Sequence, residues 1–245
     1  MGVLEWNWAV GVTTAPRKSP TLESCLQSLS LAGWDSPRLF AEPFSSKSKI
    51  FSNYPFSMRS TTLGVFPNWY LGLTELYLRM PHADAYLMFQ DDALVARDAR
   101  AYLENTLWPA AEVGVVSLYC PSREHVRDLT GFREINRGWA AWGAVAYIFS
   151  NPGVRQFLSD PVVLNHRHHG PSSGVRNIDP VVGSWCQRNQ LPYFVHIPTL
   201  VQHIGATSTI KPASGLKGNR VAIDFDPEFP RKHQSLSVQS ETDTP

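Results

Sequence analysis

The first 43 residues contain the feature that most restricts the fold of this chain, a strand followed by a helix and a second strand. Residues 8–17 (WAVGVTTAPR) are a short apolar run that opens into a Thr/Pro/Arg loop, a pattern typical of a strand and the loop after it. Residues 19–34 follow with leucines at helical spacing, and Gly33 suits the end of that helix. Residues 37–43 (PRLFAEP) are a second short apolar run. Such a β-loop-α-β unit usually begins a doubly wound α/β sheet, so we predict that fold class.

The rest of the chain continues this alternation of apolar runs and amphipathic segments. We predict strands in residues 83–89, 113–120 and 192–205, the last of which closes the sheet. Residues 139–150 are typical of a strand or of a strand that enters a helix. We predict helices in residues 68–80, 151–160 and 178–189. Residues 45–65 are typical of a loop or short irregular strands, and the last dozen residues are polar enough to be disordered.

Composition excludes several classes of protein. With 245 residues the chain can bury a sizeable core, and its net charge of +1 gives no overall attraction to nucleic acid or membrane. No apolar run approaches the roughly 20 residues that a membrane helix requires, and residues 1–12 lack the basic start of a signal peptide. Three widely spaced cysteines favour neither a disulfide framework nor a zinc site. We therefore expect reduced thiols, a cytoplasmic protein and no membrane partner.

Two adjacent carboxylates end one of the buried runs. Residues 86–97 read YLMFQDDALVAR, so Gln90, Asp91 and Asp92 stand where a central strand leaves the sheet. Ligands bind at the carboxyl ends of strands in α/β sheets. Neighbouring carboxylates repel each other unless a cation compensates them, and Mg²⁺ and Mn²⁺ prefer oxygen ligands of this kind. The pair predicts a Mn²⁺ or Mg²⁺ site, with a solvated acidic turn as the alternative.

The loop VGVTTAPR, the FQDD motif and the late LVQHIG element together resemble the GT-A-fold glycosyltransferases that use a nucleotide sugar and carry a DXD motif. The resemblance covers residues 8–210. It implies a single GT-A-like domain with a Rossmann-like mixed central sheet flanked by helices. It also implies that Asp92 binds the metal, that Asp91 lies near the sugar nucleotide, and that His203 is a second metal ligand. A lone His at a strand end is also a common structural hydrogen-bonding group.

The same resemblance assigns the first loop and Gln90 to the donor, which we expect to be a UDP-linked sugar. Thr13, Thr14 and Ala15 would receive the base and ribose, and Arg17 can reach phosphate. Gln90 departs from the acidic residue usual at the first DXD position, although its amide can still hydrogen-bond a ribose hydroxyl. The alternative is an ordinary strand-to-helix loop.

Two further segments supply candidate residues. Trp139 and Trp142 stand among small residues in GWAAWGA, where an aromatic face can stack on the donor sugar; core packing is the alternative. Asp179 in RNIDPVVGSW is the candidate base that takes the proton of the acceptor hydroxyl in an inverting reaction. An Asp before a Pro at a helix start is also a common capping residue. Inversion is our expectation, and retention stays open.

We expect the acceptor to be a hydroxyl-bearing glycan, protein or hydroxylated nucleic-acid base. His166, His168 and His169 lie in a polar run that is typical of an acceptor-side loop rather than a metal site. A basic face is an alternative hypothesis, and it would combine this run with Lys47, Lys49, Arg59 and Arg176.

One domain is expected in residues 1–210, with the donor part in about 1–95 and the acceptor part in about 96–210. Residues 211–245 then form a lid segment and a polar tail. Asp224 and Asp226 are a second acidic pair in this segment, and they rank below Asp91 and Asp92 as metal ligands because they follow the sheet.

Two other functions remain open. A nucleotidyltransferase would share the sheet and the metal, but TTAPR lacks the glycines that such enzymes normally carry after their first strand. An inactive GT-A-like module that binds sugar or nucleotide would tolerate loss of the carboxylates and the histidine, which this chain retains.

Overall fold

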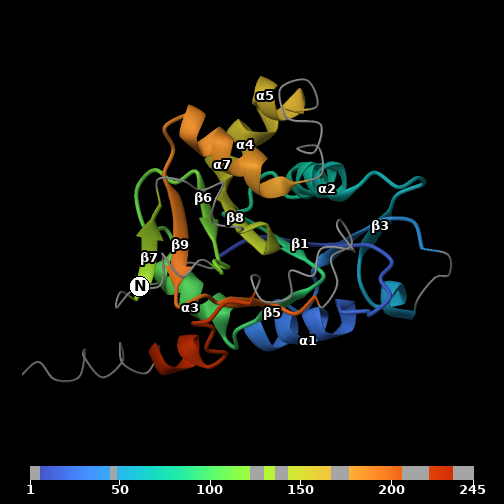
Figure 1. Cartoon of the computed structure of the whole chain (residues 1–245), viewed down its shortest axis with the longest axis horizontal. Helices are drawn as coiled ribbons and strands as arrows, with labels where there is room; N and C mark the ends of the chain where they lie inside the picture. The colour runs from blue at the N-terminus through green and yellow to red at the C-terminus, as the bar shows by residue number, and fades with distance from the viewer. Residues whose placement is uncertain are drawn as a thin grey trace, which may run out of the picture.

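The computed structural model describes residues 6–44, 49–121, 130–135, 143–166, 177–205 and 221–233. They form a single α/β domain in which a large mixed sheet lies between two layers of helices (Figure 1), which confirms the predicted fold class. The strands are β1 (Trp8–Thr14), β2 (Arg38–Ala41), β3 (Phe56–Met58), β4 (Ala85–Gln90), β5 (Ala93–Val95), β6 (Val115–Ser117), β7 (Gly131–Glu134), β8 (Ala146–Ser150), β9 (Tyr193–Ile197) and β10 (Val201–His203). The helices are α1 (Leu22–Ala32), η1 (Lys49–Ser52), α2 (Val65–Arg79), α3 (Ala99–Thr106), η3 (Gly143–Val145), α4 (Asn151–Ser159), α5 (Pro161–Leu164) and α7 (Ile178–Arg188).

The order of the strands in the main sheet places the predicted site at the carboxyl ends of two neighbouring central strands, β1 and β4. The order is β3-β2-β1-β4-β8-β6-β9-β7, and the first four strands are parallel. Strand β8 then runs antiparallel to both β4 and β6. Because β1 and β4 are parallel neighbours with Thr13 opposite Gln90, the loop after β1 and the two aspartates after β4 leave the sheet side by side.

The last predicted strand does not close the sheet as expected. Residues 192–205 contain two strands, and only β9 belongs to the main sheet, where β7 covers it on the outer side. Strand β10 leaves the sheet and pairs antiparallel with β5, placing His203 opposite Ala93. The correction matters for function because this two-stranded sheet carries His203 to the residues that follow β4.

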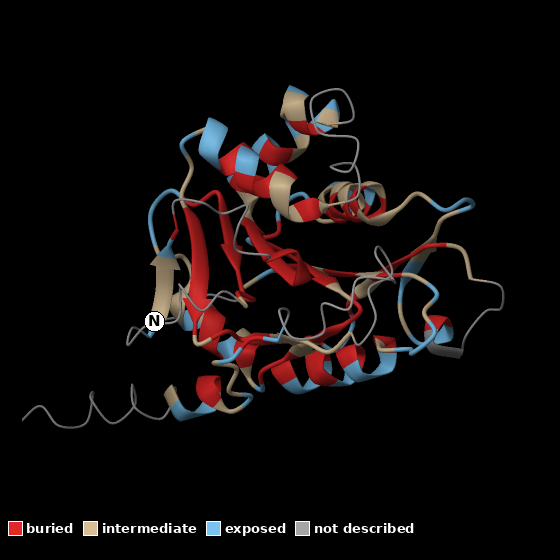
Figure 2. Cartoon of the chain, viewed as in Figure 1, coloured by how far each residue is buried: buried red, intermediate tan, exposed pale blue. Residues whose placement is uncertain are grey.

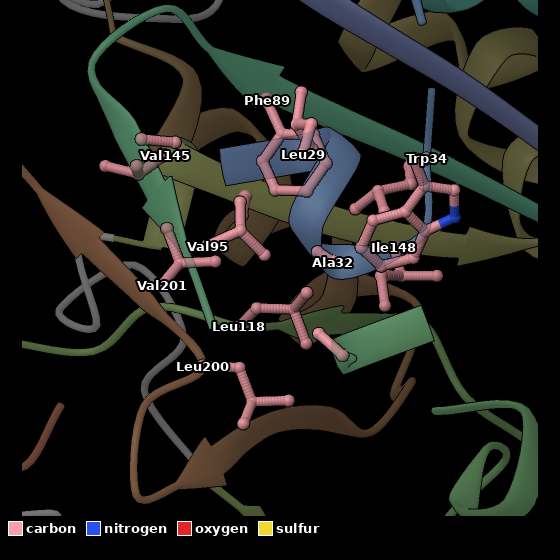
Figure 3. Packing of buried hydrophobic residues seen from close by; sticks show 14 of the residues in the cluster. Leu29, Ala32, Trp34, Phe89, Val95, Leu118, Val145, Ile148, Leu200 and Val201 are labelled. Carbon is pink, nitrogen blue, oxygen red and sulfur yellow. The ribbon is translucent and has the colours of Figure 1, made fainter. Parts of the chain in front are cut away.

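The core has two parts, one on each face of the sheet. Side chains of successive strand residues point to opposite faces, so Leu87 and Phe89 of β4 pack toward α1, while Tyr86 and Met88 pack toward α2 and α4. Figure 2 shows the central strands of the sheet buried and the helices buried on the sides that face it. Figure 3 shows the α1 side, where Leu29 and Trp34 meet Phe89.

Helix boundaries differ from the expected ones by a few residues. Gly33 ends α1 with a φ of 104°, a left-handed conformation that favours glycine, as predicted. Helix α2 begins at Val65, earlier than the expected residue 68, because Pro67 fits in a first helical turn. Among the described residues, no helix has the length and apolar content to cross a membrane.

Candidate functional site

The two aspartates lie beside the loop after β1. The Asp91 amide donates to the Thr13 carbonyl oxygen at 3.0 Å, which extends the contact between β1 and β4 by one residue. Both carboxylates are buried, with Asp91 2% and Asp92 4% exposed. They are therefore not a solvated acidic turn, and their charges must be compensated inside the protein.

Arg17 supplies that compensation. Its guanidinium forms an ion pair with Asp91, and Nη1 lies 2.6 Å from Asp92 Oδ2. The Thr14 hydroxyl also donates to Asp91 Oδ2 at 2.6 Å. The structure thus brings three of the predicted donor-site residues, Thr14, Arg17 and Asp91, into direct contact. One guanidinium facing two carboxylates nevertheless leaves an excess of negative charge, which is costly in a buried site.

His203, on β10 of the two-stranded sheet, contacts the Asp92 carboxylate. Its Nε2 lies 3.1 Å from Asp92 Oδ2, although the two residues are 111 positions apart in sequence. The Ile204 amide donates to the Asp92 carbonyl oxygen at 2.8 Å and fixes this approach. Gly205 follows so closely that a Cβ on it would lie 2.7 Å from Asp92 Oδ2, so a larger residue would force the Asp92 side chain to move.

The environment shifts the pKa values of the two carboxyl groups in opposite directions. Burial raises the pKa of Asp91 to about 6, an effect that the charge of Arg17 only partly offsets. Burial also acts to raise the pKa of Asp92, but the hydrogen bond with His203 and the charge of Arg17 outweigh it and lower the pKa to about 2. Asp92 is therefore the more firmly ionised of the two, which suits a metal ligand.

The residues present fit a divalent cation. Within the described part of the chain, Asp92 Oδ1 is buried and has no hydrogen-bond partner. Carboxylate oxygens beside an imidazole suit Mn²⁺ better than Mg²⁺. No group of three or more His, Cys, Asp or Glu side chains in the described residues is arranged to hold a metal ion. The protein thus offers the Asp92 and His203 pair, with Asp91 alongside, and a cation there would need further ligands from a bound diphosphate and water.

These residues border a pocket of about 200 Å³. All the predicted residues of the first loop and the QDD motif line it, as does His203: Thr13, Thr14, Ala15, Arg17, Gln90, Asp91, Asp92 and His203. Five other lining residues were not predicted: Glu42, Thr62, Gly64, Val65 and Asn68. Glu42 carried a usable signal, since it directly follows β2, the parallel neighbour of β1. The other four come from a segment without regular periodicity and from the start of α2.

Glu42 is one of the residues that line this pocket, and it is hydrogen-bonded to the start of α2. It is 6% exposed, and its two carboxylate oxygens accept hydrogen bonds from the Leu63 and Gly64 amides at 2.9 and 2.8 Å. These amides lie at the start of α2, where Gly64 provides no side-chain cap. The carboxylate of Glu42, which follows β2, therefore binds the N-terminus of α2 and fixes the loop that lines the pocket.

Asp179 is connected to the pocket through a single residue. The Gln90 amide group donates to the Ala144 carbonyl oxygen at 3.1 Å, and the Ala144 amide donates to Asp179 Oδ1 at 2.7 Å. The Tyr147 hydroxyl donates to the same oxygen at 3.2 Å. Asn177, not Asp179, occupies the capping position of α7, and Asp179 lies in its first turn. Its role as a base stays a prediction.

Several predicted residues lie outside the described residues: Lys47, Trp139, Trp142, His168, His169 and Arg176. The second acidic pair has structural partners. Asp224 accepts hydrogen bonds from the amide and hydroxyl of Thr199, at 3.2 and 2.9 Å. Asp226 pairs with Lys232 at 2.7 Å. Within the described part of residues 211–245, none lines the pocket at Asp91 and Asp92.

Comparisons with known proteins give structural neighbours only. No family model matches the chain, and no curated protein does. The fold is similar to that of a cytidylyltransferase from Leptospira borgpetersenii serovar Hardjo-bovis (strain JB197), with a TM-score of 0.50 at 10% identity over 98% of this chain and 99% of that one. This likeness supports the single α/β domain with a large mixed sheet.

Two other solved structures are more distant. A mannose-1-phosphate geranyltransferase from Thermus thermophilus gives a TM-score of 0.45 at 14% identity, over 76% of this chain and 73% of that one. A proposed glucose-1-phosphate thymidylyltransferase from Bacillus anthracis, solved with sucrose, gives a TM-score of 0.46 at 11% identity, over 80% of this chain and 89% of that one.

Proposed function

We propose that the chain is a transferase that binds a nucleotide-linked sugar together with a divalent cation at Asp92 and His203, and moves the sugar to a hydroxyl acceptor. The observation that carries this proposal is the contact of 3.1 Å between Asp92 and His203, which the fold brings together at the carboxyl edge of the sheet beside Asp91. A bound cation would neutralise the diphosphate and stabilise it as it leaves. We expect a UDP-linked sugar as donor.

The residues of this chain divide the remaining work between them. Arg17 now lies across both aspartates, and a cation at Asp92 would free its guanidinium to contact the diphosphate. Thr13, Thr14 and Ala15 line the pocket and would receive the nucleoside, and Gln90 would face the ribose or sugar. The Asp179 carboxylate would take the acceptor proton while the acceptor oxygen bonds to the anomeric carbon and the bond to the diphosphate breaks.

Nucleotidyl transfer is the second candidate, and the comparisons favour it over sugar transfer. One neighbour, which matches 98% of this chain, is a cytidylyltransferase. In that reaction a sugar phosphate or related acceptor attacks the α-phosphorus of a nucleoside triphosphate, and pyrophosphate leaves. The loop after β1 argues for sugar transfer, since TTAPR has no glycines whose amides would wrap a triphosphate.

The first test is thermal melting of the protein with UDP, CTP and a set of UDP-sugars, each with and without Mn²⁺. We expect stabilisation by one nucleotide family that requires Mn²⁺ and is lost in Asp92→Ala and His203→Ala. Absence of any nucleotide effect, with every metal, would remove the proposal. The second test identifies the reaction. Release of UDP from a UDP-sugar supports sugar transfer, whereas release of pyrophosphate from a nucleoside triphosphate with a sugar phosphate supports nucleotidyl transfer.

Asp179 is tested by the variant Asp179→Asn, which keeps an acceptor for the Ala144 amide. We expect turnover to fall by about 10²- to 10⁴-fold while the stabilisation by nucleotide and Mn²⁺ is retained. Unchanged turnover would exclude Asp179 as the base and favour a mechanism that retains the anomeric configuration.

A further inference from the structure

A second pocket, of about 630 Å³, lies at the opposite end of the parallel strands, where β1 and β2 begin. Three indole rings and three guanidinium groups line it, from Trp6, Trp8, Trp34, Arg38, Arg79 and Arg100. None of these residues lines the pocket at Asp91 and Asp92. The volume is within the range of about 300–1,000 Å³ that is usual for small-molecule sites.

The indole rings form a continuous aromatic wall. Trp6 stacks on Trp8 with ring centroids 5.6 Å apart and an angle of 25° between the planes. Trp8 in turn meets Trp34 edge to face at 5.4 Å. Trp6 is only partly buried, so its ring is the accessible end of this wall. Aromatic faces of this kind pack against the C–H face of a sugar ring.

The guanidinium groups carry more positive charge than their partners neutralise. The Glu75 carboxylate is shared by Arg38 at 3.8 Å, Arg59 at 3.8 Å and Arg79 at 3.1 Å. One negative charge thus faces three positive ones. Burial and the charge of Arg79 both lower the pKa of Arg38, as expected for a cation without enough counter-charge. An anion bound between Arg38 and Arg79 would relieve this imbalance.

Two other charged groups line the pocket, Arg100 and Asp35. Arg100 donates to Glu104 at 2.7 Å, and Glu104 also accepts from Trp8 Nε1 at 2.9 Å. Asp35 is the one carboxylate that lines the pocket within the described residues, and it accepts from the Ser30 hydroxyl at 2.5 Å. The excess positive charge of the pocket therefore lies at Arg38 and Arg79, which share the Glu75 carboxylate.

Trp34 adds another donor. It is 4% exposed, and its Nε1 has no hydrogen-bond partner in the part of the chain that the structure describes. Figure 3 shows this nitrogen on the side of the ring away from Leu29 and Phe89. A buried N–H without an acceptor is unfavourable, so an oxygen of a ligand in the pocket would stabilise it.

We propose that this pocket binds an acidic sugar, meaning a carbohydrate that carries a carboxylate, sulfate or phosphate group. The C–H face of its ring packs on Trp6, which Trp8 supports from behind, and its acidic group lies between Arg38 and Arg79. A neutral sugar would leave the excess charge uncompensated, and a free anion would leave the aromatic wall uncovered. The site is separate from the proposed transfer reaction and does not depend on it.

Tryptophan fluorescence of the full chain tests this binding. The probes are glucose 6-phosphate, glucose 6-sulfate and glucuronic acid, with glucose and inorganic phosphate as comparisons. We expect at least one acidic sugar to bind at least tenfold more tightly than both glucose and inorganic phosphate. Equal binding of inorganic phosphate would reduce the site to an anion site and overturn the proposal, and so would absence of binding by all three acidic sugars.

Variants locate the ligand. Arg38→Gln combined with Arg79→Gln should weaken the bound acidic sugar at least tenfold, whereas Arg155→Gln, on the exposed side of α4, should leave its affinity unchanged. If the double variant fails to fold, Arg79→Gln alone serves, since Arg79 is 53% exposed and its loss should still weaken binding about threefold. Unchanged affinity in the folded pocket variant would overturn the proposal.

Discussion

Two neighbouring residues, Asp91 and Asp92, share a backbone turn and have opposite pKa shifts because their hydrogen-bond partners differ. Thr14 and Arg17 reach Asp91, but burial dominates and raises its pKa to about 6. Asp92 gains His203 in addition to Arg17, and its pKa falls to about 2. The difference arises because β10 carries His203. At the residue scale, the two-stranded sheet therefore determines which aspartate has the lower pKa.

Gly205 tests whether the spacing of this pair matters. In Gly205→Ala the new Cβ would lie 2.7 Å from Asp92 Oδ2 and 3.0 Å from His203 Cε1, so the pair must separate. We expect the affinity for nucleotide with Mn²⁺, measured by titration calorimetry, to fall at least tenfold.

Gly153→Ala is the matched control for this variant. Its Cβ would meet Ser150 Oγ at 3.0 Å, far from the site, and it should bind the nucleotide as the unmodified protein does. Equal affinity of Gly205→Ala and Gly153→Ala would show that the Asp92–His203 spacing is not required for binding.

At the scale of elements, the sequence was informative where one segment alone determines the structure. The apolar periodicity and Gly33 were sufficient to predict β1, α1 and β2. Strand β10 was predicted as a strand but assigned to the wrong sheet, because only its partner β5, three residues long, decides where it pairs. Three residues carry too little periodicity to be recognised.

The candidate site divides in the same way. The QDD motif is one continuous stretch of sequence, and so is the loop after β1. Both could therefore be predicted from the sequence. Three other lining residues come from separate segments: Glu42, Thr62 and Asn68. They reach the pocket only because β2 lies beside β1 and α2 begins next to both strands. Glu42 could have been singled out because it directly follows β2, whereas no local pattern marks Thr62 or Asn68 as part of a site.

Helix α2 provides a prediction at this scale, because the carboxylate at its start comes from another element. In Glu42→Ala the amides of Leu63 and Gly64 lose their acceptors, and the helix start loses its negative charge. We expect the free energy of unfolding, measured in urea, to fall by about 2–4 kcal/mol.

Glu42→Gln keeps one acceptor oxygen, so its free energy of unfolding should fall by less than half as much as that of Glu42→Ala. If the two variants were equally stable, the hydrogen bonds to the Glu42 oxygens would not be the source of the stabilisation.

Across the whole molecule, α2 joins the two pockets. Asn68 near its start lines the pocket at Asp91 and Asp92, and Arg79 at its end lines the pocket beside Trp34. Between them Glu75 contacts Arg79, and it also contacts Arg59, whose Nε donates to Asn68 Oδ1 at 2.8 Å. The Glu75 carboxylate thus connects Arg79, which lines one pocket, through Arg59 with Asn68, which lines the other, although the two pockets lie at opposite ends of the parallel strands.

His196 of β9 connects another set of elements and gives a pH dependence of stability. It is fully buried, hydrogen-bonds Tyr102 of α3 at 2.9 Å, and packs on Phe132 of β7 and Phe229. Burial, with a smaller effect from His233, lowers its pKa from 6.5 to about 4 in spite of a hydrogen bond with the Pro198 carbonyl oxygen. Between pH 6.5 and 4 the unfolded chain therefore binds a proton that the folded chain does not.

The free energy of unfolding should consequently fall as the pH is lowered through this window, by up to about 3 kcal/mol from His196, with no further loss from this residue below pH 4. Urea unfolding at several pH values between 7 and 4.5 measures the effect. In His196→Gln the side chain no longer titrates, so the decline should be shallower by most of that amount, whereas the exposed His82→Gln should match the unmodified protein. Parallel pH profiles for all three proteins would mean that protonation of His196 does not limit stability, and that the packing of α3, β7 and Phe229 around β9 tolerates a charged imidazole.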